Sequence, residues 1–375
     1  MAKLTISEVA IVNDQHLFSG TSTHAYKIYK NLREHNIASE IHQFLISNDK
    51  PKEDNLFIKY GLLHNYNGNS KYVYDAKLAF NFLTGLNWRS FKEIKSNIIL
   101  LSGPTLLPLA RYSAKSIVIG HDLFFLENPG GSIFLASYMK RMYKAFKNAN
   151  YVMVNSEFTR NVFIRSLKLD QNRVQVVYPY VDTDVFHPGN SIVKDLLKVK
   201  EEDVLILSVG GDEPNKNIES VLKLLKKLPH NYKLIRVGRN FNTLKLINDP
   251  SLKDRVITLG NVDIKLLSEL YRGCNLFIFP SLFEGFGIPL IEAMASGIPF
   301  IASNRASLPE VAGDSGIICE PYDIECMSKA VIELNFDDSL RKYYVDKGLK
   351  RVMEFSKEKQ FRSLSNVLKL VNEEI

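Results

Sequence analysis

The amino-acid sequence predicts two α/β domains, each built on a parallel sheet covered by helices. Short apolar segments of strand length alternate with amphipathic stretches of helix length along the chain, which is typical of parallel α/β layers. The 375 residues exceed what one hydrophobic core usually supports, so two domains are expected. A turn-rich segment from Tyr178 to Gly189 interrupts the periodicity, and we predict that it links the domains.

The predicted strands form two series, one on each side of this linker. The strands expected before it are 9–13, 39–44, 98–102, 116–119, 151–155 and 174–177. Those expected after it are 204–209, 233–237, 256–259, 276–280, 299–303 and 316–319. We place the N-terminal domain at 1–185, the C-terminal domain at 186–355 and a terminal helix at 356–375.

Composition and cysteine content narrow the class of protein. With 45% hydrophobic and 24% charged residues, the chain has the composition of a packed soluble protein. No apolar run approaches the roughly 20 residues of a membrane-spanning helix, and the first residues do not resemble a secretory signal, so the cytoplasm is the expected location. The cysteines show neither a CxxC pair nor a disulfide framework. We therefore expect Cys274, Cys319 and Cys326 to be separate core or surface thiols in a reducing compartment, without structural zinc.

The net charge of +7 comes from the first half of the chain, where residues 1–187 hold 22 Lys and Arg against 15 Asp and Glu. Such a basic half can meet a phosphate-bearing substrate or anionic lipid, and the lack of any nucleic-acid motif argues against nucleic acid. The stretch 132–148 places Lys140, Lys144 and Lys147 on one helical face. Peripheral contact with an anionic membrane is one interpretation. Ordinary packing on the first sheet is the favoured one.

The segment 280–292 carries the most chemical information. A strand ends there, a glycine-bearing loop follows, and Pro289 stands where the first turn of a helix tolerates proline. The N-terminus of such a helix binds anions. Glu284 in the loop and Glu292 in the helix lie at different depths, which suits hydroxyl groups on two parts of one polar ligand, such as a hexose and a ribose. The two loop glycines let backbone N–H groups approach that ligand closely.

This segment, Glu284-Gly285-Phe286-Gly287 followed by Glu292, resembles the E-x7-E motif of a large family of retaining glycosyltransferases, glycosyltransferase family 4. That family includes bacterial phosphatidylinositol and lipopolysaccharide mannosyltransferases and sucrose synthases. The resemblance implies the GT-B architecture, in which two Rossmann-like domains face each other across a cleft and a terminal helix packs back on the N-terminal domain. It implies that the first glutamate contacts the donor sugar, the second the ribose, and the loop amides the sugar and diphosphate. The residues carried over are Glu284, Phe286, Gly287, Ile288, Leu290 and Glu292.

The loop from Ser208 to Asn217 also resembles the family's pattern. Lys216 at the helix start supplies a point charge for a diphosphate. Gly211 and Asn215 stand where the family usually carries arginines, so more of the leaving group's charge falls to Lys216, to helix dipoles or to another base. Arg239 is a candidate for that base, with an ordinary surface position as the alternative. The predicted donor site further includes Gly211, Arg239, Asn261 and Val262.

Three segments of the first half resemble the family as well. The strand before His121 delivers this residue to its carboxyl end, where the resemblance places it beside the donor's anomeric carbon, with its backbone carbonyl stabilising an oxocarbenium-like state. Gly20 lies in a segment similar to the first loop, which approaches the donor phosphates or the acceptor. Ser156, in the segment 155–160, is expected to cap a helix, with the acceptor cleft as the second interpretation. The predicted catalytic residues are His121, Glu284 and Lys216.

The predicted function is the transfer of a hexose from a UDP- or GDP-sugar to an acceptor hydroxyl with retention, the acceptor being a lipid-linked glycan or another glycoconjugate. No cofactor is expected. Asp182-Thr183-Asp184 resembles a metal-binding triplet, but it lies in the linker, so we expect no metal site. Two alternatives remain open, a nucleotide-sugar epimerase of the same fold and a non-catalytic sugar-nucleotide-binding protein. A nicotinamide-dependent oxidoreductase is disfavoured because no GxGxxG follows the early strands.

Overall fold

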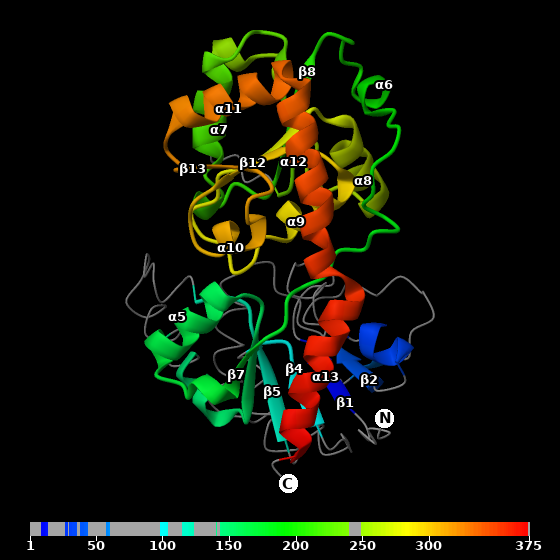
Figure 1. Ribbon diagram of the computed structural model, residues 1–375, viewed down its shortest axis with the longest axis vertical. Coiled ribbons are helices and arrows are strands. Elements are labelled where there is room, and N and C mark those ends of the chain that lie inside the picture. Colours follow the sequence, from blue (N-terminus) through cyan, green and yellow to red (C-terminus); the bar gives the residue numbers. More distant parts are fainter. Residues whose placement is uncertain are drawn as a thin grey trace. The chain divides into compact units, whose positions relative to one another are not determined.

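The computed structural model forms two compact units, 1–178 with 361–375, and 179–360 (Figure 1). It describes 27–28, 30–35, 98–103, 115–123, 140, 143–239 and 249–373, and the backbone of the strands at 9–13, 38–43 and 58–60. The sequence placed the two junctions at 185 and 355. Tyr180, Val181 and Phe186 are buried, and Val181 N–H donates to the Phe355 carbonyl at 3.2 Å, so the segment after 178 packs within the second unit.

The first unit contains a seven-stranded parallel sheet in the order β3-β2-β1-β4-β5-β6-β7. Its strands are β1 (Val9–Asn13), β2 (Ala38–Gln43), β3 (Ile58–Tyr60), β4 (Ile98–Leu101), β5 (Lys115–Gly120), β6 (Tyr151–Val154) and β7 (Val174–Val176). Six of them confirm the predicted series to within two residues at each end. The sequence prediction missed β3, because three residues are too few to show a period.

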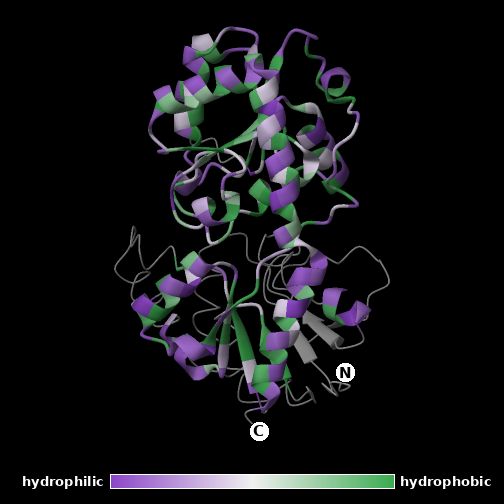
Figure 2. Ribbon diagram, in the orientation of Figure 1, coloured by the Kyte–Doolittle hydropathy of each residue, from purple (hydrophilic) through white to green (hydrophobic). Residues whose placement is uncertain are grey.

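Apolar residues cover both faces of the described part of this sheet (Figure 2). One face packs on α5 (Glu157–Leu167) and on the short helix η3 (Ala145–Asn148); η4 (Gln171–Arg173) precedes β7. The other face packs on α13 (Lys357–Glu373), which contributes apolar side chains at helical spacing. The C-terminal part of α13 therefore belongs to the first unit. Its buried side chains are Leu364, Val367, Leu368 and Val371.

The second unit contains a six-stranded parallel sheet in the order β10-β9-β8-β11-β12-β13. The strands are β8 (Val204–Val209), β9 (Tyr232–Val237), β10 (Val256–Thr258), β11 (Leu276–Phe279), β12 (Phe300–Ser303) and β13 (Ile317–Cys319). The helices are α6 (Val193–Leu197), η5 (Pro214–Lys216), α7 (Ile218–Lys227), η7 (Pro250–Leu252), α8 (Ile264–Gly273), α9 (Ile288–Ser296), α10 (Leu308–Ala312), α11 (Ile324–Phe336), α12 (Asp338–Arg351) and η8 (Val352–Phe355).

The strand order reverses between β8 and β11. The chain runs outward from β8 through β9 to β10, returns to pair β11 with the other edge of β8, and continues through β12 to β13. The loops that leave β8 and β11 therefore turn in opposite directions from adjacent strands. Ligands of open α/β sheets bind at such a switch point, beyond the carboxyl ends of the strands. The loops 210–217 and 280–287 both start there.

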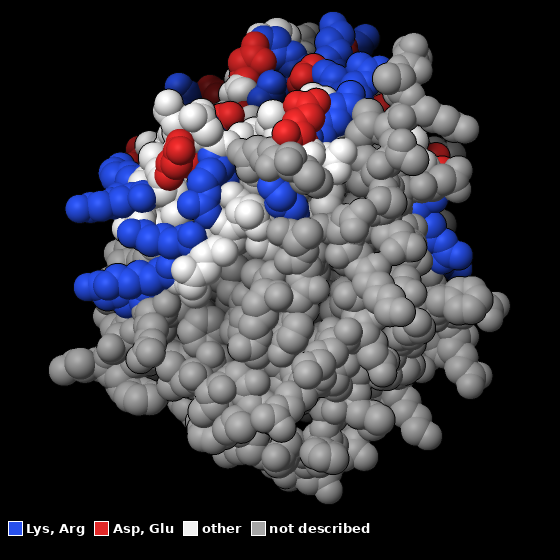
Figure 3. Space-filling model, turned by 90° about the horizontal axis from the view of Figure 1, so that it is seen from below, with Lys and Arg blue, Asp and Glu red and all other residues white. Residues whose placement is uncertain are grey.

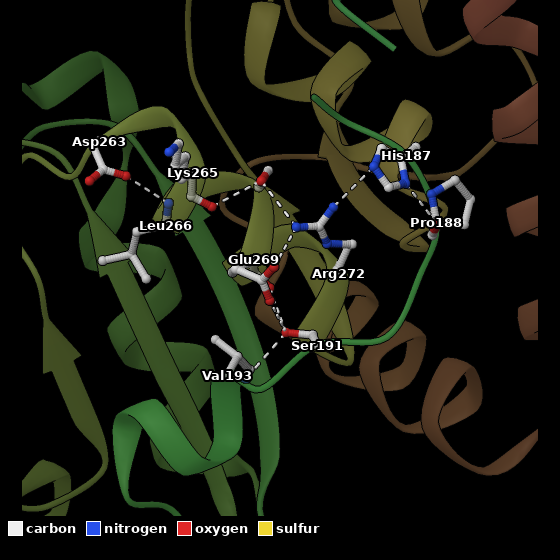
Figure 4. Close-up of polar contacts among 10 residues, drawn as sticks. His187, Pro188, Ser191, Val193, Asp263, Lys265, Leu266, Glu269 and Arg272 are labelled. Carbon is white, nitrogen blue, oxygen red and sulfur yellow. Dashed lines mark hydrogen bonds and ion pairs between the residues drawn. The ribbon is translucent and has the colours of Figure 1, made fainter. Parts of the chain in front are cut away.

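A polar cluster ties the segment after the junction to α8 (Figure 4). Ser191 Oγ donates to the Glu269 backbone and side chain, each at 3.0 Å, and accepts from Val193 N–H at 3.2 Å. Arg272 bonds to Glu269 and approaches His187 Nε2 at 3.3 Å. These contacts hold residues 187–193 on the second unit.

The expectation of three separate thiols is wrong for two of the cysteines. Cys319 and Cys326 form a disulfide, with their Cα atoms 6.0 Å apart. Cys319 ends β13 and Cys326 lies in the first turn of α11, so the turn between them brings the two side chains together although their sequence spacing matches no framework. The expectation of a reducing compartment rested on unpaired cysteines, and the disulfide removes that support. Cys274 is a buried thiol, and burial raises its pKa well above the ordinary value.

Candidate functional site

The loops after β8 and β11 are joined by an ion pair between two predicted catalytic residues. Lys216 Nζ lies 2.7 Å from Glu284 Oε1. The two side chains are 23% and 13% exposed, so both remain within reach of a ligand while much of their surface is covered. An ion pair shielded in this way is screened less by salt than one on the open surface. The switch point thus presents a cation and a carboxylate in direct contact.

Lys216 reaches Glu284 by passing over a glycine. Gly210 follows β8 with φ +148°, and a Cβ built there would stand 3.3 Å from Lys216 Cδ. A larger residue would strain the backbone and crowd the lysine stem. Lys216 Nζ also lies 5.9 Å from the centre of the Phe279 ring, within the range of a cation–π contact.

Two asparagines connect the loops through backbone hydrogen bonds. Asn215 accepts from Leu282 N–H at 2.7 Å and donates through Nδ2 to Phe283 O at 3.3 Å. Asn217, buried and left-handed at φ +54°, donates through Nδ2 to Pro280 O at 3.1 Å and to Pro321 O at 2.8 Å. Asn215 therefore supports the loop geometry at a position where the family usually carries an arginine. Neither set of contacts could be predicted from residue types, because every partner is a backbone group.

The Ser307 side chain contacts the backbone of the glycine loop just before α9. Its hydroxyl lies 2.9 Å from Glu284 O and 2.8 Å from Phe286 O. Gly287 adopts φ +109°, immediately before the helix, and Pro289 occupies the first turn. The Phe286 ring is buried against Phe355 with ring centres 5.4 Å apart, so its side chain packs inward. Pro289 has no N–H and the Leu290 N–H donates to Gly287 O at 2.9 Å, which leaves the Ile288 N–H as the first-turn donor without a partner inside α9. A donor at a helix N-terminus attracts anions.

Glu292 is held by Tyr271, a residue that the sequence interpretation missed. The Tyr271 hydroxyl lies 3.2 Å from Glu292 Oε2 and 3.1 Å from Pro289 O. Burial raises the pKa of Tyr271 well above its ordinary value, and the charge of Glu292 adds to this, so the hydroxyl keeps its proton and can donate to the carboxylate. A tyrosine in an otherwise apolar helix face gives no sequence signal for this role.

Tyr271→Phe is expected to raise the Michaelis constant for a donor nucleotide about tenfold, because the Glu292 carboxylate loses a hydrogen bond worth about 1.4 kcal/mol. Steady-state kinetics with varied donor concentration measure this effect. Tyr344→Phe, in α12, is the control and should leave the constant unchanged. An unaltered Michaelis constant in Tyr271→Phe would mean that Glu292 keeps its orientation without the hydroxyl.

The remaining predicted donor residues differ in their surroundings. Gly211 is buried in the loop after β8, and Arg239, which follows β9, is exposed. Asn261 is exposed and Val262 is partly buried, both between β10 and α8. Ile288 is the first residue of α9, whereas the Leu290 side chain is fully buried and can offer a ligand only its backbone. Gly20 lies outside the described residues.

His121 belongs to the first unit and follows β5. Its Nε2 lies 3.1 Å from the Ser102 carbonyl, and its own carbonyl accepts from Asn155 Nδ2 at 3.0 Å. Burial lowers the pKa of His121 to about 4, with the Ser102 carbonyl acting against this shift, so the ring is neutral at pH 7. Because a carbonyl only accepts, a neutral ring must donate from Nε2 to Ser102.

Metal-ligating side chains do not gather anywhere in the part of the chain that the structure describes. Asp182, singled out by the Asp-Thr-Asp triplet, closes a turn instead, since its backbone carbonyl accepts from Val185 and Phe186 N–H and its carboxylate accepts from Asp184 N–H. Among the described helices, none is long and apolar enough to cross a bilayer.

Comparison with family models identifies the family to which the chain belongs. Residues 192–351 match the model described as Glycosyl transferases group 1, and residues 18–185 match that of Glycosyltransferase Family 4. The chain belongs to this glycosyltransferase family. The resemblance drawn from the Glu284 and Glu292 motif is thereby confirmed.

The chain is similar in sequence to a curated mannosyltransferase and similar in fold to solved glycosyltransferase structures. The O-antigen chain mannosyltransferase B of Escherichia coli is 29% identical over 245 residues, which cover 62% of this chain and 64% of that protein, so the chain spans less than two thirds of this curated relative. Sucrose-phosphate synthase from Thermosynechococcus elongatus superposes with a TM-score of 0.81 at 18% identity, covering 98% of this chain and 100% of that one. HepE of Anabaena, solved with UDP and glucose, superposes with a TM-score of 0.74 at 16% identity, covering 97% of this chain and 99% of that one. The predicted α/β class with GT-B domains is confirmed.

Proposed function

We propose that the chain is a retaining hexosyltransferase that moves a hexose from a nucleoside-diphosphate sugar to an acceptor hydroxyl. The observation that carries the proposal is the contact of Lys216 with Glu284 at the β8 and β11 switch point, beside the N-terminus of α9. A diphosphate needs cations and N–H donors, and a sugar needs a carboxylate that accepts from its hydroxyl groups. Both kinds of group occur there, in a chain that belongs to a glycosyltransferase family.

In this proposal each side chain has one task. Lys216 turns from Glu284 to the diphosphate when the donor binds, which frees the carboxylate to accept hydrogen bonds from the sugar. Glu292, oriented by Tyr271, accepts from the ribose hydroxyl groups. Lys216 and the Ile288 amide at the start of α9 stabilise the charge that grows on the departing diphosphate, as preorganised electrostatic catalysis requires. The positive charge comes from the protein, so no metal or other cofactor is assigned to the reaction.

The proposed chemistry keeps the anomeric configuration. The bond between the anomeric carbon and the diphosphate oxygen breaks while a bond to the acceptor oxygen forms on the same face of the sugar. The acceptor's proton passes to the departing diphosphate oxygen, so the transfer balances without a covalent enzyme intermediate. The His121 carbonyl stabilises the oxocarbenium-like state in this scheme, in keeping with the family resemblance.

A lipid-linked glycan, or another glycoconjugate, is the proposed acceptor. The curated relative from Escherichia coli is named for O-antigen chains. Lys and Arg side chains gather along the left edge of the described surface in Figure 3, and exposed ones near η3 and α5 include Lys144, Lys147 and Lys168. Such a face can attract anionic lipid. We therefore propose a cytoplasmic protein in peripheral contact with the membrane.

The test is mass spectrometry of the purified chain with UDP-glucose, another UDP-hexose or GDP-mannose, with and without polyprenyl-diphosphate glycans. We expect an acceptor to gain the mass of one hexose, and Glu292→Ala to abolish the gain at low donor concentration because the ribose loses its acceptor group. Glu219→Ala, in the exposed pair with Lys223 on α7, is the matched control and should transfer normally.

Other outcomes contradict the proposal in distinct ways. Isomerisation of the donor without any acceptor would identify an epimerase of the same fold. Donor binding without conversion across the panel would identify a non-catalytic sugar-nucleotide-binding protein. Inverted anomeric configuration in the product, measured by NMR coupling constants, would overturn retention while leaving transfer in place.

A further inference from the structure

Three adjacent strand ends of the first unit are connected through His121. Strands β4, β5 and β6 lie side by side, with Gly120 opposite Val154 in the register. The His121 ring bonds to Ser102, which follows β4, and the His121 carbonyl bonds to Asn155, which follows β6. The residue is therefore fastened on both sides, by its ring to one neighbouring strand and by its backbone to the other.

The orientation of the Asn155 amide is determined by its partner. The His121 carbonyl can only accept, so Asn155 must turn Nδ2 toward it, at 3.0 Å. Asn155 is 6% exposed, and its Oδ1 is buried with no hydrogen-bond partner. A buried acceptor without a partner costs free energy, and most buried polar groups avoid this cost. Folding alone therefore does not account for an asparagine at this position.

Helix capping does not account for Asn155 either. The N-cap of α5 is Ser156, whose Oγ accepts from Thr159 N–H at 3.0 Å and donates to the Thr159 hydroxyl at 2.9 Å. The preference of helix starts for Ser or Asn is thus satisfied by the next residue. What remains for Asn155 is its single hydrogen bond to the His121 carbonyl.

We propose that Asn155 is a positioning residue for sugar transfer, which orients the His121 carbonyl in the reacting complex. The inference rests on the proposed function. The hydrogen bond from Asn155 restrains the plane of the His121 peptide and therefore the direction of its carbonyl dipole. In the proposed reaction, the negative end of this dipole stabilises positive charge on the sugar ring. Asn155 acts through this peptide and need not touch the substrate.

The test compares Asn155→Ala with the wild type in kinetics and thermal unfolding. We expect kcat to fall about 100-fold, because small misplacement of a reacting group has effects of this size. The Michaelis constant for the donor should change less than about threefold, since donor-binding groups are untouched. The melting temperature should shift by no more than about 3 °C, because the variant loses one hydrogen bond and also the unsatisfied acceptor.

Asn150→Ala is the matched control. Asn150 stands just before the same strand, at its other end, and its Oδ1 accepts from Ser116 N–H at 2.9 Å and from the Ser116 hydroxyl at 3.1 Å. Its loss should lower the melting temperature and leave kcat near the wild-type value. The two asparagines thus separate a structural role from a positioning role.

Asn155→Asp adds a pH profile that a structural role would not produce. An ionised carboxylate cannot donate to the His121 carbonyl, whereas the protonated acid can, and burial raises the pKa of a carboxyl group. We expect kcat of this variant, divided by that of the wild type, to rise at least fivefold between about pH 8.5 and about pH 5.5. His121, with a pKa of about 4, stays neutral in this range. Among the described residues, the other titratable groups on neighbouring segments include Asp122, Tyr143, Glu157, Arg160 and Tyr178.

The outcomes separate this inference from the proposed function. If the wild type transfers sugar while Asn155→Ala keeps its kcat, or Asn155→Asp shows a flat ratio over pH, the inference fails and the proposed function stands. A wild type that transfers no sugar to any acceptor would overturn both. A fall in kcat with unchanged melting temperature, together with recovery of Asn155→Asp at low pH, would support the positioning role.

Discussion

Lys216→Ala is expected to lower kcat of sugar transfer about 100-fold or more, the size of effect seen when one preorganised group that faces developing charge is removed. Lys216 is the cation that contacts Glu284, and Asn215 supplies no charge beside it. The leaving diphosphate would then depend on backbone amides alone. Single-turnover kinetics at saturating donor measure the chemical step apart from donor binding.

The control for Lys216 is Lys223→Ala, which removes an exposed lysine of α7 paired with Glu219 at 2.8 Å. An exposed pair of this kind contributes little, so both kcat and stability should remain close to the wild type. If Lys216→Ala kept full turnover, the diphosphate charge would have to be met elsewhere, and Arg239 would become the first alternative to test.

Gly287→Ala is expected to destabilise the second unit by about 3 kcal/mol and to abolish donor binding. Gly287 has φ +109°, a conformation that other residues rarely adopt, and a Cβ there would stand 2.7 Å from Leu308 Cδ2. Backbone strain and overpacking each cost about 1–3 kcal/mol. Relief of this strain would require the backbone at Gly287 to change, which would move the start of α9. Chemical denaturation and isothermal calorimetry with UDP or GDP measure the two effects.

Gly189→Ala is the matched substitution within the same unit. A Cβ there meets Arg272 Cδ at 3.5 Å, an ordinary contact, and its φ lies outside the strained range. We expect nearly unchanged stability and donor binding. Equal behaviour of the two variants would show that the loop before α9 tolerates a side chain, which would contradict the geometry assigned to Gly287.

Much of the fold could be predicted because its signals are local. Each buried parallel strand is a short apolar run, so the second series, from 204–209 to 316–319, was predicted to within one residue at every strand end. The short strand β3 escaped prediction for the same reason, since three residues carry no period. The Glu284 to Glu292 motif is also local, as one loop and one helix turn contain it.

Contacts between distant segments could not be predicted in this way. Lys216 and Glu284 are 68 residues apart, and Asn217 and Pro321 are 104 apart, so their meeting depends on the order of strands in the sheet. The Tyr271 contact with Glu292 depends on how α8 lies against α9. The Cys319–Cys326 disulfide was misjudged because a strand end and a helix start approach closely only after the turn between them folds.

The sequence by itself determined the α/β class, the two series of strands, the family motif and the identity of the residues that carry charge. These properties follow from periodicity and from residues that are neighbours along the chain. Only the tertiary structure decided that Lys216 pairs with Glu284, that Tyr271 holds Glu292 and that Asn155 holds His121. The physical reason is that hydrogen bonds and ion pairs act over about 3 Å, and which side chains come that close is decided by strand order and packing, not by position in the chain.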